Sequence, residues 1–374
     1  MQKNENPGRK KTVLHVTNSN AKSQYLLSIA KLYNREKYNV VIGCFDVYGD
    51  LNIELEKLNI PTFNIPIKRN TSYLFKITAF IRVLKKYKVD ILHLHTFFVS
   101  FFGIIAGRAA RVEQIVMTRH HADQHQQLNK KIHSYIDKWT ANKADKVIAV
   151  SEFTKEIMVE SEKVKPAKIR VIYNGILPLT FSESFNKQKL IDELKIKETD
   201  KILLCISRLY SEKNIDSIIK AMAILKDKQN FQLLVAGNGL GNVYHEKLIQ
   251  LASRSGLSDR VHFLGFRNDI ANLIDFSDVL VHPSFSESFG FVVLEAMSQG
   301  RSIIISDIPA LNEIATRDIA YFFDPRDPKN LADVIIKWLN SKDIIERAEK
   351  GKERFEEKFT FSRMIKSYEN YYEE

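Results

Sequence analysis

The stretch VLVHPSFSESFGFVVLEA, residues 279–296, decides the fold. Its apolar start, Val279–Val281, predicts a buried strand, and Gly290 lets the backbone turn from the following loop into a helix. The free N–H groups in the first turn of such a helix suit a phosphate group. Glu287 lies in the loop and Glu295 about one turn inside the helix, where a carboxylate can accept hydrogen bonds from sugar hydroxyls. The stretch therefore predicts a strand–loop–helix unit of a parallel sheet with a ligand site at the strand's carboxyl end.

The same alternation of short β-rich runs and helical patterns extends along the whole chain. Strands separated by roughly 10–20 residues of helical pattern predict βαβ units and a parallel sheet. The dipeptide Asn174-Gly175 and the polar stretch at 178–186 interrupt the alternation, so we expect a linker near residues 174–186. The predicted strands before it are 12–17, 39–45, 61–65, 90–95, 115–118, 146–150 and 169–172, and those after it are 202–206, 231–236, 261–264, 279–282, 302–306 and 320–323.

These patterns predict an α/β protein of two doubly wound, Rossmann-like domains, residues 1–175 and 176–356, that face each other across a cleft. The length of 374 residues agrees, because it exceeds what one hydrophobic core usually covers. With 44% hydrophobic and 27% charged residues, 14 Gly and 2 Cys, the composition excludes a wholly disordered, a collagen-like or a disulfide-scaffold chain.

Several features favour a cytoplasmic location. The start is polar, which argues against a signal peptide, and Cys44 and Cys205 follow apolar residues as buried free thiols would. The most apolar segment, Phe97–Gly107, is too short to span a bilayer. Peripheral contact with the inner face of the membrane remains compatible with this pattern.

Charge is unevenly distributed along the chain, whose formal net charge is +11. Residues 1–180 hold 29 basic and 15 acidic side chains, and the remainder holds 27 and 30. A basic half suggests an anionic partner: a membrane surface, nucleic acid or a phosphorylated acceptor. Nucleic acid is not favoured, because the sequence shows no recognition motif or aromatic stacking platform.

The predicted helix at 72–88 concentrates this basic charge. Leu74 and Phe75 belong to its apolar set, whereas Lys76 lies mostly elsewhere around the helix, and Lys68 and Arg69 precede it. Two interpretations stay open: a core-packed helix with a solvated face, or docking against anionic lipid headgroups.

A second motif, Ser207–Asn214, follows the strand at 202–206 and precedes a helix. Its Arg208 and Lys213 suit a diphosphate, although two solvated surface cations would give the same pattern. The glycines in residues 237–241 imitate a dinucleotide site, but Asn242 stands where the third glycine belongs, so NAD is not favoured.

Residues 146–310 resemble the retaining glycosyltransferase family 4, whose fold is GT-B. The resemblance is carried by ADKVIAVSEFTKE, IRVIYNGI, ISRLYSEKNIDSIIKAMAIL, LLVAGNG, VHFLGFRNDI and SDVLVHPSFSESFGFVVLEAMSQGRSIIISD, with Glu287 and Glu295 as the family's E-x7-E pattern. It implies a hexosyltransferase-type enzyme (EC 2.4) that uses a nucleotide-sugar, UDP-sugar favoured over GDP-sugar. The acceptor would be lipid-linked or a glycan, as in cell-surface polysaccharide, lipopolysaccharide or glycolipid synthesis. Domain 1–175 would bind the acceptor and 176–356 the donor, and the helix at 357–374 would pack back on the first domain.

Site residues follow from the same resemblance. Arg208 and Lys213 would bind the diphosphate, Glu287 would contact the donor sugar and Glu295 would contact the ribose hydroxyls. The implied catalytic residues are His120, Glu287, Arg208 and Lys213. The implied donor-binding residues are Arg208, Lys213, Phe266, Arg267, Glu287, Ser288, Phe289, Gly290, Phe291, Val292 and Glu295.

The N-terminal half departs from the family pattern. The family usually has a Gly-rich loop after its first strand, whereas residues 17–21 contain no glycine, and Asn18 and Ser19 would supply side-chain hydrogen bonds instead. His120 is the first candidate for the family's active-site histidine and His121 the second, although a histidine after a strand is often structural. His93 and His95 share one face of a strand, and we interpret His93 as packing. For His95 an acceptor-side and a structural role stay open; the acceptor-side candidates are Asn18, Ser19, His95 and His121.

No metal or other cofactor is expected. The sequence has no Asp-x-Asp triplet and no cysteine–histidine cluster, and Arg208, Lys213 and a helix N-terminus can neutralise the diphosphate. Two alternatives remain: a non-catalytic scaffold that binds a nucleotide-sugar, suggested by the missing glycine loop, and an epimerase or phosphorylase of the same fold.

Overall fold

The computed structural model describes residues 9–66, 72–121 and 131–374. The chain forms two compact units: unit 1 consists of Met1–Gly175 with Phe361–Glu374, and unit 2 of Ile176–Thr360. The first boundary coincides with the expected one, whereas the return to unit 1 comes between residues 360 and 361 rather than 356 and 357.

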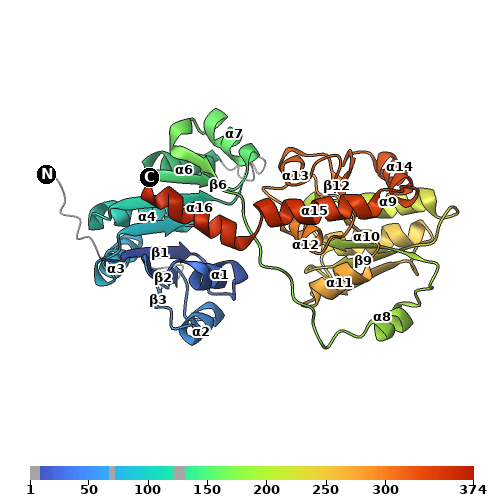
Figure 1. Ribbon diagram of the computed structural model, residues 1–374, viewed down its shortest axis with the longest axis horizontal. Helices are drawn as coiled ribbons and strands as arrows, with labels where there is room; N and C mark the ends of the chain where they lie inside the picture. The colour runs from blue at the N-terminus through green and yellow to red at the C-terminus, as the bar shows by residue number, and fades with distance from the viewer. Residues whose placement is uncertain (1–8, 67–71, 122–130) are drawn as a thin grey trace. The chain divides into compact units, whose positions relative to one another are not determined.

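Unit 1 is built on a seven-stranded parallel sheet with the order β3-β2-β1-β4-β5-β6-β7 (Figure 1). Apolar side chains on both faces of the sheet form two separate cores, one that includes residues of α3 and α4 and one that includes residues of α1 and α16. The strands are β1 (Lys11–Thr17), β2 (Tyr38–Cys44), β3 (Thr62–Asn64), β4 (Ile91–Leu94), β5 (Gln114–Arg119), β6 (Lys146–Ala149) and β7 (Ile169–Val171). The helices are α1 (Gln24–Leu32), α2 (Asp50–Lys57), α3 (Tyr73–Lys86), α4 (Phe97–Ala110), α6 (Lys131–Lys143), α7 (Glu152–Glu160), η1 (Pro166–Lys168) and α16 (Phe361–Glu373).

The register of β1 against β4 places two histidines side by side. His15 is the Cα partner of His93, so both side chains project from the same face of the parallel sheet. The order of the sheet reverses between β1 and β4, because β1 is also paired with β2. In doubly wound sheets this switch point is where ligands bind.

The C-terminal helix α16 covers one face of the sheet of unit 1, next to α1 (Figure 1). Tyr368, Tyr371 and Tyr372 are buried in this contact, and the Tyr25 hydroxyl bonds that of Tyr368 at 2.7 Å. Three buried aromatic side chains contribute several kcal/mol of apolar burial, about 1.5–3 kcal/mol for a large side chain. The last 13-residue helix is therefore an integral part of unit 1.

Unit 2 contains a six-stranded parallel sheet with the order β10-β9-β8-β11-β12-β13 and one extended core. The strands are β8 (Lys201–Ile206), β9 (Phe231–Ala236), β10 (Val261–Gly265), β11 (Val279–His282), β12 (Ile303–Ser306) and β13 (Tyr321–Phe323). The helices are α8 (Lys187–Leu194), η2 (Ser211–Lys213), α9 (Ile215–Leu225), α10 (Val243–Arg254), α11 (Ile270–Phe276), α12 (Phe291–Ser298), α13 (Pro309–Ile314), α14 (Pro328–Leu339) and α15 (Ile344–Lys358).

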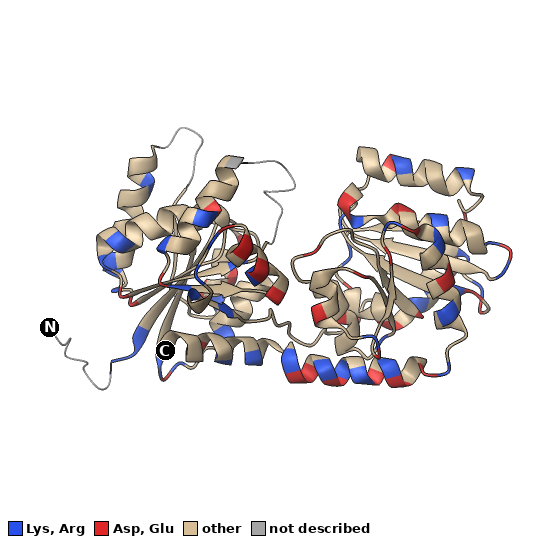
Figure 2. Ribbon diagram, turned by 90° about the horizontal axis from the view of Figure 1, so that it is seen from above, with Lys and Arg blue, Asp and Glu red and all other residues tan. Residues whose placement is uncertain are grey.

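Charges of both signs alternate along α15, as the banded helix in Figure 2 shows. Ion pairs one turn apart join Arg347 to Asp343 at 2.7 Å and Lys350 to Glu346 at 2.7 Å. Such exposed pairs stabilise a helix by about 0.3–0.5 kcal/mol each. The predicted C-terminal helix at 357–374 is wrong in its start, since α15 extends to Lys358 in unit 2 and α16 begins at Phe361 in unit 1.

In helix α3 the exposed and the buried side chains differ from those expected from the sequence. Leu74 and Phe75 are 71% and 51% exposed, although they belong to the apolar set, whereas Lys76 is buried. The reason is local: the Lys76 ammonium lies 5.0 Å from the Tyr73 ring centroid and 5.8 Å from that of Phe102, so cation–π contacts replace water. Lys68 and Arg69 lie outside the described residues. Within the described ranges, no helix has both the length and the apolar character needed to cross a bilayer.

Candidate functional site

A charged cluster forms at the carboxyl ends of two adjacent strands of unit 2, β8 and β11. The Glu287 carboxylate accepts hydrogen bonds from Lys213 Nζ at 2.5 Å and is joined to His282 Nε2 at 3.0 Å. Ser284 Oγ lies 3.3 Å from the same His282 nitrogen. Because β8 and β11 are hydrogen-bonded neighbours, the loops that follow them meet at one edge of the sheet. The structure thus brings together Lys213 and Glu287, which are 74 residues apart.

Asn214 holds this pair of loops in place. Its side-chain amide donates to the carbonyl oxygens of Pro283 at 3.0 Å and Pro325 at 2.7 Å. Its φ of 54° ends the short helix η2, and a backbone bond from Phe285 N to Glu212 O at 3.0 Å joins the loops directly. Asn is one of the few residues that adopt this left-handed conformation at low cost. The site is therefore preformed by the backbone as well as by the ion pair.

Glu287 is ionised in this environment. Burial raises its pKa, but hydrogen bonds and electrostatic interactions with His282 and Lys213 outweigh that effect and bring the pKa to about 2. The carboxylate is therefore a permanent hydrogen-bond acceptor at neutral pH. Lys213 is already partly neutralised by it, so an incoming diphosphate would share this ammonium with Glu287.

Glu295 behaves differently, although it lies on the adjoining helix α12. Burial raises the pKa of its carboxyl to about 7, and in the described part of the chain no cation lies within ion-pair distance of it. A ligand that supplies hydroxyl donors would stabilise the ionised form. The site thus offers one carboxylate that is ionised in advance and one that is available to a ligand.

Gly290 controls the start of α12. Its φ of 117° is unfavourable for other residues, and a Cβ there would lie 2.7 Å from Leu311 Cδ2. Val293 N and Leu294 N bond to Gly290 O, so the N–H groups of Phe291 and Val292 precede the first helical hydrogen bonds. These two groups and the helix dipole favour an anion. Ser288 and the buried Phe289 complete the connection between Glu287 and the helix.

The remaining donor-side residues predicted from the sequence differ in their exposure and in whether their charge is already paired. Arg208 is exposed, with its guanidinium 5.3 Å from the Tyr210 ring centroid. Phe266 is 65% exposed, as a stacking residue would be. Arg267 is bound to Asp269, with Nε to Oδ1 at 2.8 Å, so its charge is balanced by its own loop. The structure therefore leaves Arg208, rather than Arg267, as the cation available to a ligand.

The glycines of residues 237–241 have a packing role. A Cβ on Gly237 would lie 1.8 Å from Ser207 O, and its φ is 152°. Leu209 N bonds to Asn238 O at 2.8 Å, so this loop directly supports the Arg208 segment. The pattern that imitates a dinucleotide site instead reflects the close approach of two loops.

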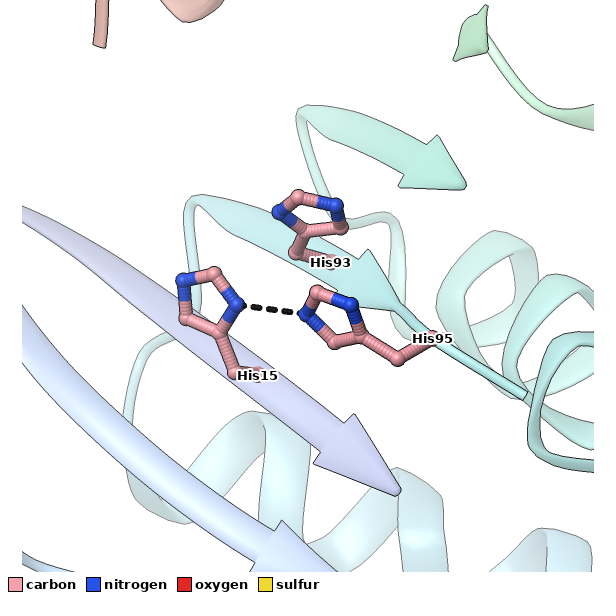
Figure 3. Close-up of side chains that lie close together, drawn as sticks. All are labelled: His15, His93 and His95. Carbon is pink, nitrogen blue, oxygen red and sulfur yellow. Dashed lines mark hydrogen bonds between the residues drawn. The ribbon is translucent and has the colours of Figure 1, made fainter. Parts of the chain in front are cut away.

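A second cluster, in unit 1, consists of His15, His93 and His95, which Figure 3 shows, together with His120. His15 Nδ1 lies 2.8 Å from His95 Nε2, and His95 Nδ1 lies 3.2 Å from His120 Nε2. His93 is buried as expected for a packing residue, yet both of its ring nitrogens are hydrogen-bonded, to Tyr372 and Thr118. Burial lowers the pKa of His15 to about 3 and that of His120 to about 4, and lowers those of His93 and His95 well below the ordinary value. All four rings are therefore neutral at physiological pH.

The other acceptor-side candidates do not join this cluster. His121 Nε2 bonds to Asp137 at 2.9 Å, beside the buried ion pair of Arg119 with Glu162. Ser19 Oγ accepts from Ala21 N at 3.2 Å within its own turn, and Asn18 is exposed. The structure thus joins His95 to His120 by a hydrogen bond and His121 to Asp137.

Sequence reasoning missed His15, His282, Ser284, Asn214 and Tyr372. His282 ends a buried strand immediately before the loop of Glu287, and that position was the available signal. Nothing in the local sequence indicates the others. The three histidines of Figure 3 are also the one group in the described residues whose ligand atoms, within 4.8 Å of one another, could hold a metal ion; the sequence analysis had not found such a group.

Two doubly wound parallel units, with polar residues at the carboxyl ends of their strands, define the GT-B class. The crystal structure of Anabaena Alr3699/HepE in complex with UDP and glucose has a TM-score of 0.84 at 22% identity and covers 97% of this chain and 99% of its own. Residues 23–178 match the family model described as Glycosyltransferase Family 4, and residues 186–357 match Glycosyl transferases group 1. The chain belongs to glycosyltransferase family 4, has the GT-B fold and is a transferase enzyme.

Curated relatives are similar over most of their length. An uncharacterized glycosyltransferase of Methanocaldococcus jannaschii is 28% identical over 301 residues, which are 76% of this chain and 75% of the relative. The Escherichia coli UDP-Gal:alpha-D-GlcNAc-diphosphoundecaprenol alpha-1,3-galactosyltransferase is 28% identical over 293 residues, 75% of each chain. Other relatives are named as glycosyltransferases of O-antigen and capsular polysaccharide biosynthesis, and one as an alpha-monoglucosyldiacylglycerol synthase.

Proposed function

We propose that the protein transfers a sugar, with retention of configuration, from a UDP-sugar to a hydroxyl of a lipid-linked or glycan acceptor in cell-surface polysaccharide or glycolipid synthesis. Unit 2 binds the donor and unit 1 the acceptor. The observation that carries the proposal is the Lys213–Glu287–His282 cluster beside Arg208 and the start of α12. Support for UDP comes from the name of the E. coli galactosyltransferase and from the UDP bound in the Anabaena structure. Retention is what the family resemblance implies.

The chemistry follows from the charges of the cluster. Arg208, Lys213 and the N–H groups at the start of α12 stabilise the negative charge that develops on the departing diphosphate. Glu287, ionised before the substrate arrives, accepts hydrogen bonds from donor-sugar hydroxyls, and Glu295 accepts them from the ribose. A guanidinium, an ammonium and a helix N-terminus neutralise a diphosphate without a divalent cation, so we expect turnover in EDTA.

We place the acceptor at the cytoplasmic face of a membrane. Tyr73, Leu74 and Phe75 at the start of α3 are 70%, 71% and 51% exposed. Arg82, Lys85, Lys86 and Lys88, later in the same segment, are exposed and basic. Apolar side chains beside cations suit the interface of an anionic bilayer, at about 1 kcal/mol for each basic residue near the surface. The E. coli relative acts on a diphosphoundecaprenol-linked sugar, which fits such a surface.

Incubation with UDP-glucose and UDP-galactose tests the proposal, with release of UDP and transfer to a glycolipid extract as the readouts. Lys213→Ala and Glu287→Gln should lower turnover by about 100-fold, since each removes a charge in direct contact with the donor. Lys228→Ala changes an exposed lysine of the same unit and is the matched control. Unchanged turnover in both site variants would refute the site.

Other outcomes distinguish the alternatives. UDP-sugar binding without turnover would indicate a scaffold. An isomerised sugar formed without acceptor would indicate an epimerase, and release of a sugar phosphate that depends on inorganic phosphate would indicate a phosphorylase. Binding to vesicles that is insensitive to anionic lipid and to salt would refute the membrane surface.

A further inference from the structure

An unbroken chain of hydrogen bonds runs through the interior of unit 1 and ends on the C-terminal helix and β5. It starts at His120 Nε2, passes through both nitrogens of His95 and both of His15, and continues through the hydroxyls of Tyr33 and Tyr372 to His93 and Thr118. The six contacts, in this order, measure 3.2, 2.8, 3.0, 2.8, 2.5 and 2.6 Å. Figure 3 shows the central part, where His15 of β1 lies against His95 after β4.

Two proton arrangements use every hydrogen of these groups within the chain. A neutral imidazole has one N–H and one acceptor nitrogen, and a tyrosine hydroxyl has a single hydrogen. In both arrangements each interior member donates on one side and accepts on the other, and reversing one contact reverses all of them. Any other arrangement either sets two lone pairs against each other or leaves the hydrogen of a buried tyrosine hydroxyl without an acceptor in the chain, which is costly. The tautomers of His15, His93, His95 and His120 are thus coupled.

The proposed reaction selects the direction. Nδ1 is the nitrogen of His120 that lies outside the chain. A substrate hydroxyl that loses its proton needs a lone pair there, so the hydrogen of His120 belongs on Nε2. Every ring of the chain then carries its hydrogen on Nε2.

We infer that Tyr372 of α16 is a positioning residue for the glycosyltransferase reaction: by completing this chain, its hydroxyl holds His120 in the Nε2–H tautomer, with the Nδ1 lone pair available to a substrate hydroxyl. Within the described residues, no group lies within hydrogen-bond distance of His120 Nδ1, and the ring is partly exposed immediately after β5. The choice of a substrate hydroxyl as the partner, and with it the direction of the chain, rests on the proposed function; the coupling of the tautomers does not.

A bound metal is the competing interpretation of the same histidines. Metal ligation uses lone pairs that lie in the ring planes and converge on one point. Here the rings of His15 and His95 are stacked with an angle of 19° and those of His93 and His95 with 24°, so their planes are nearly parallel. Both nitrogens of His93 are also engaged, at 2.5 and 2.6 Å, by hydroxyl groups. The arrangement satisfies hydrogen bonds that a metal would break.

Nitrogen-15 NMR of histidine-labelled full-length protein, without any substrate, tests the coupling. In the wild type we expect His15, His93, His95 and His120 all as the Nε2–H tautomer. In Tyr372→Phe the Tyr33 hydrogen loses its acceptor and should turn to His15 Nε2. His15, His95 and His120 should then switch to Nδ1–H, while His93 keeps its hydrogen on Nε2. Tyr38→Phe is the matched control, because the Tyr38 ring makes edge-to-face contacts with Tyr33 and Tyr372 but its hydroxyl is outside the chain.

Three results would overturn the inference. They are a wild type in which any of the four rings is Nδ1–H, a Tyr372→Phe variant with the wild-type tautomer at His120, and coordination shifts at His15, His93 and His95 on adding one equivalent of Zn²⁺. UDP-glucose turnover tests the role of His120 in the reaction. Tyr372→Phe should lower kcat about tenfold or more with an unchanged KM for UDP-glucose, because His120 Nδ1 then presents an N–H to the substrate instead of a lone pair. A changed tautomer with unchanged kcat would overturn the role in the reaction, and absence of turnover in the wild type would instead refute the proposed function.

Discussion

Acidification should destabilise unit 1 selectively. His15, His93 and His95 are buried, and burial holds their pKa values far below the ordinary 6.5, at about 3 for His15. In the folded unit they stay neutral at pH 5.5, whereas in the unfolded chain they bind protons as the pH falls below about 6.5. The stability that they contribute is present above that pH and is lost as the pH falls toward the folded-state values.

The magnitude follows from the number of groups. A histidine that is neutral only in the folded state costs about 1.4 kcal/mol of unfolding free energy for each pH unit below about 6.5. His15, His93 and His95 together remove about 4 kcal/mol between about pH 7.5 and about pH 5.5, and His120, whose pKa is lowered to about 4, removes about 1 kcal/mol more. The raised pKa of Glu162 in the same unit acts in the opposite direction. In unit 2 burial lowers the pKa of the half-buried His262, so this one histidine also reduces stability as the pH falls, whereas the raised pKa of Glu295 acts in the opposite direction. Unit 2 is therefore an internal control.

Hydrogen exchange measured at both pH values gives the opening free energy of each unit separately. The slowest amides of β1 and β4 report on unit 1, and those of β8 and β9 report on unit 2, after correction for intrinsic exchange rates. His93→Gln should reduce the loss in unit 1 by about a quarter, whatever its effect on stability at neutral pH. If the strands of unit 1 lose no more than those of unit 2, the histidines are charged or accessible in the folded protein, and the reasoning is refuted.

Three further predictions concern unit 2. Arg208→Ala should raise the Kd for UDP about 10- to 100-fold in calorimetry, because one charge-assisted contact is lost; an equal Kd would exclude Arg208 from the site. Gly290→Ala should destabilise unit 2 by roughly 1–3 kcal/mol in denaturant unfolding, because φ is 117° and the new Cβ would lie 2.7 Å from Leu311; unchanged stability would show that the loop relaxes freely. Glu295→Gln should raise Tm at about pH 8 by roughly 2–6 °C and weaken UDP-sugar binding, because the pKa of about 7 makes the ionised carboxylate destabilising at alkaline pH. That stabilisation should disappear toward pH 5, and a constant difference would mean that the charge of Glu295 is not responsible.

Much of the fold and part of the site could be predicted from local sequence. Alternating apolar runs identified the parallel strands, and Gly290 after the loop of Glu287 predicted the start of α12. Lys213 and Glu287 were both singled out as residues at strand ends, and the structure brings them within 2.5 Å. Such features are local, because a strand, a tight turn or a helix start depends on neighbouring residues.

Contacts between distant segments could not be predicted in this way. The sequence alone determined that the chain alternates strands and helices in two parallel α/β units and that cations and carboxylates follow particular strands. Only the tertiary structure decided that His15 and His93 are register partners and that Tyr372, 279 residues after His93, supplies the hydroxyl between His93 and Tyr33. It also decided that Lys76 is buried against aromatic rings and that His121 is bound to Asp137. The physical reason is that a hydrogen-bond partner or a ring contact is selected by strand order and register, which local side-chain patterns do not encode.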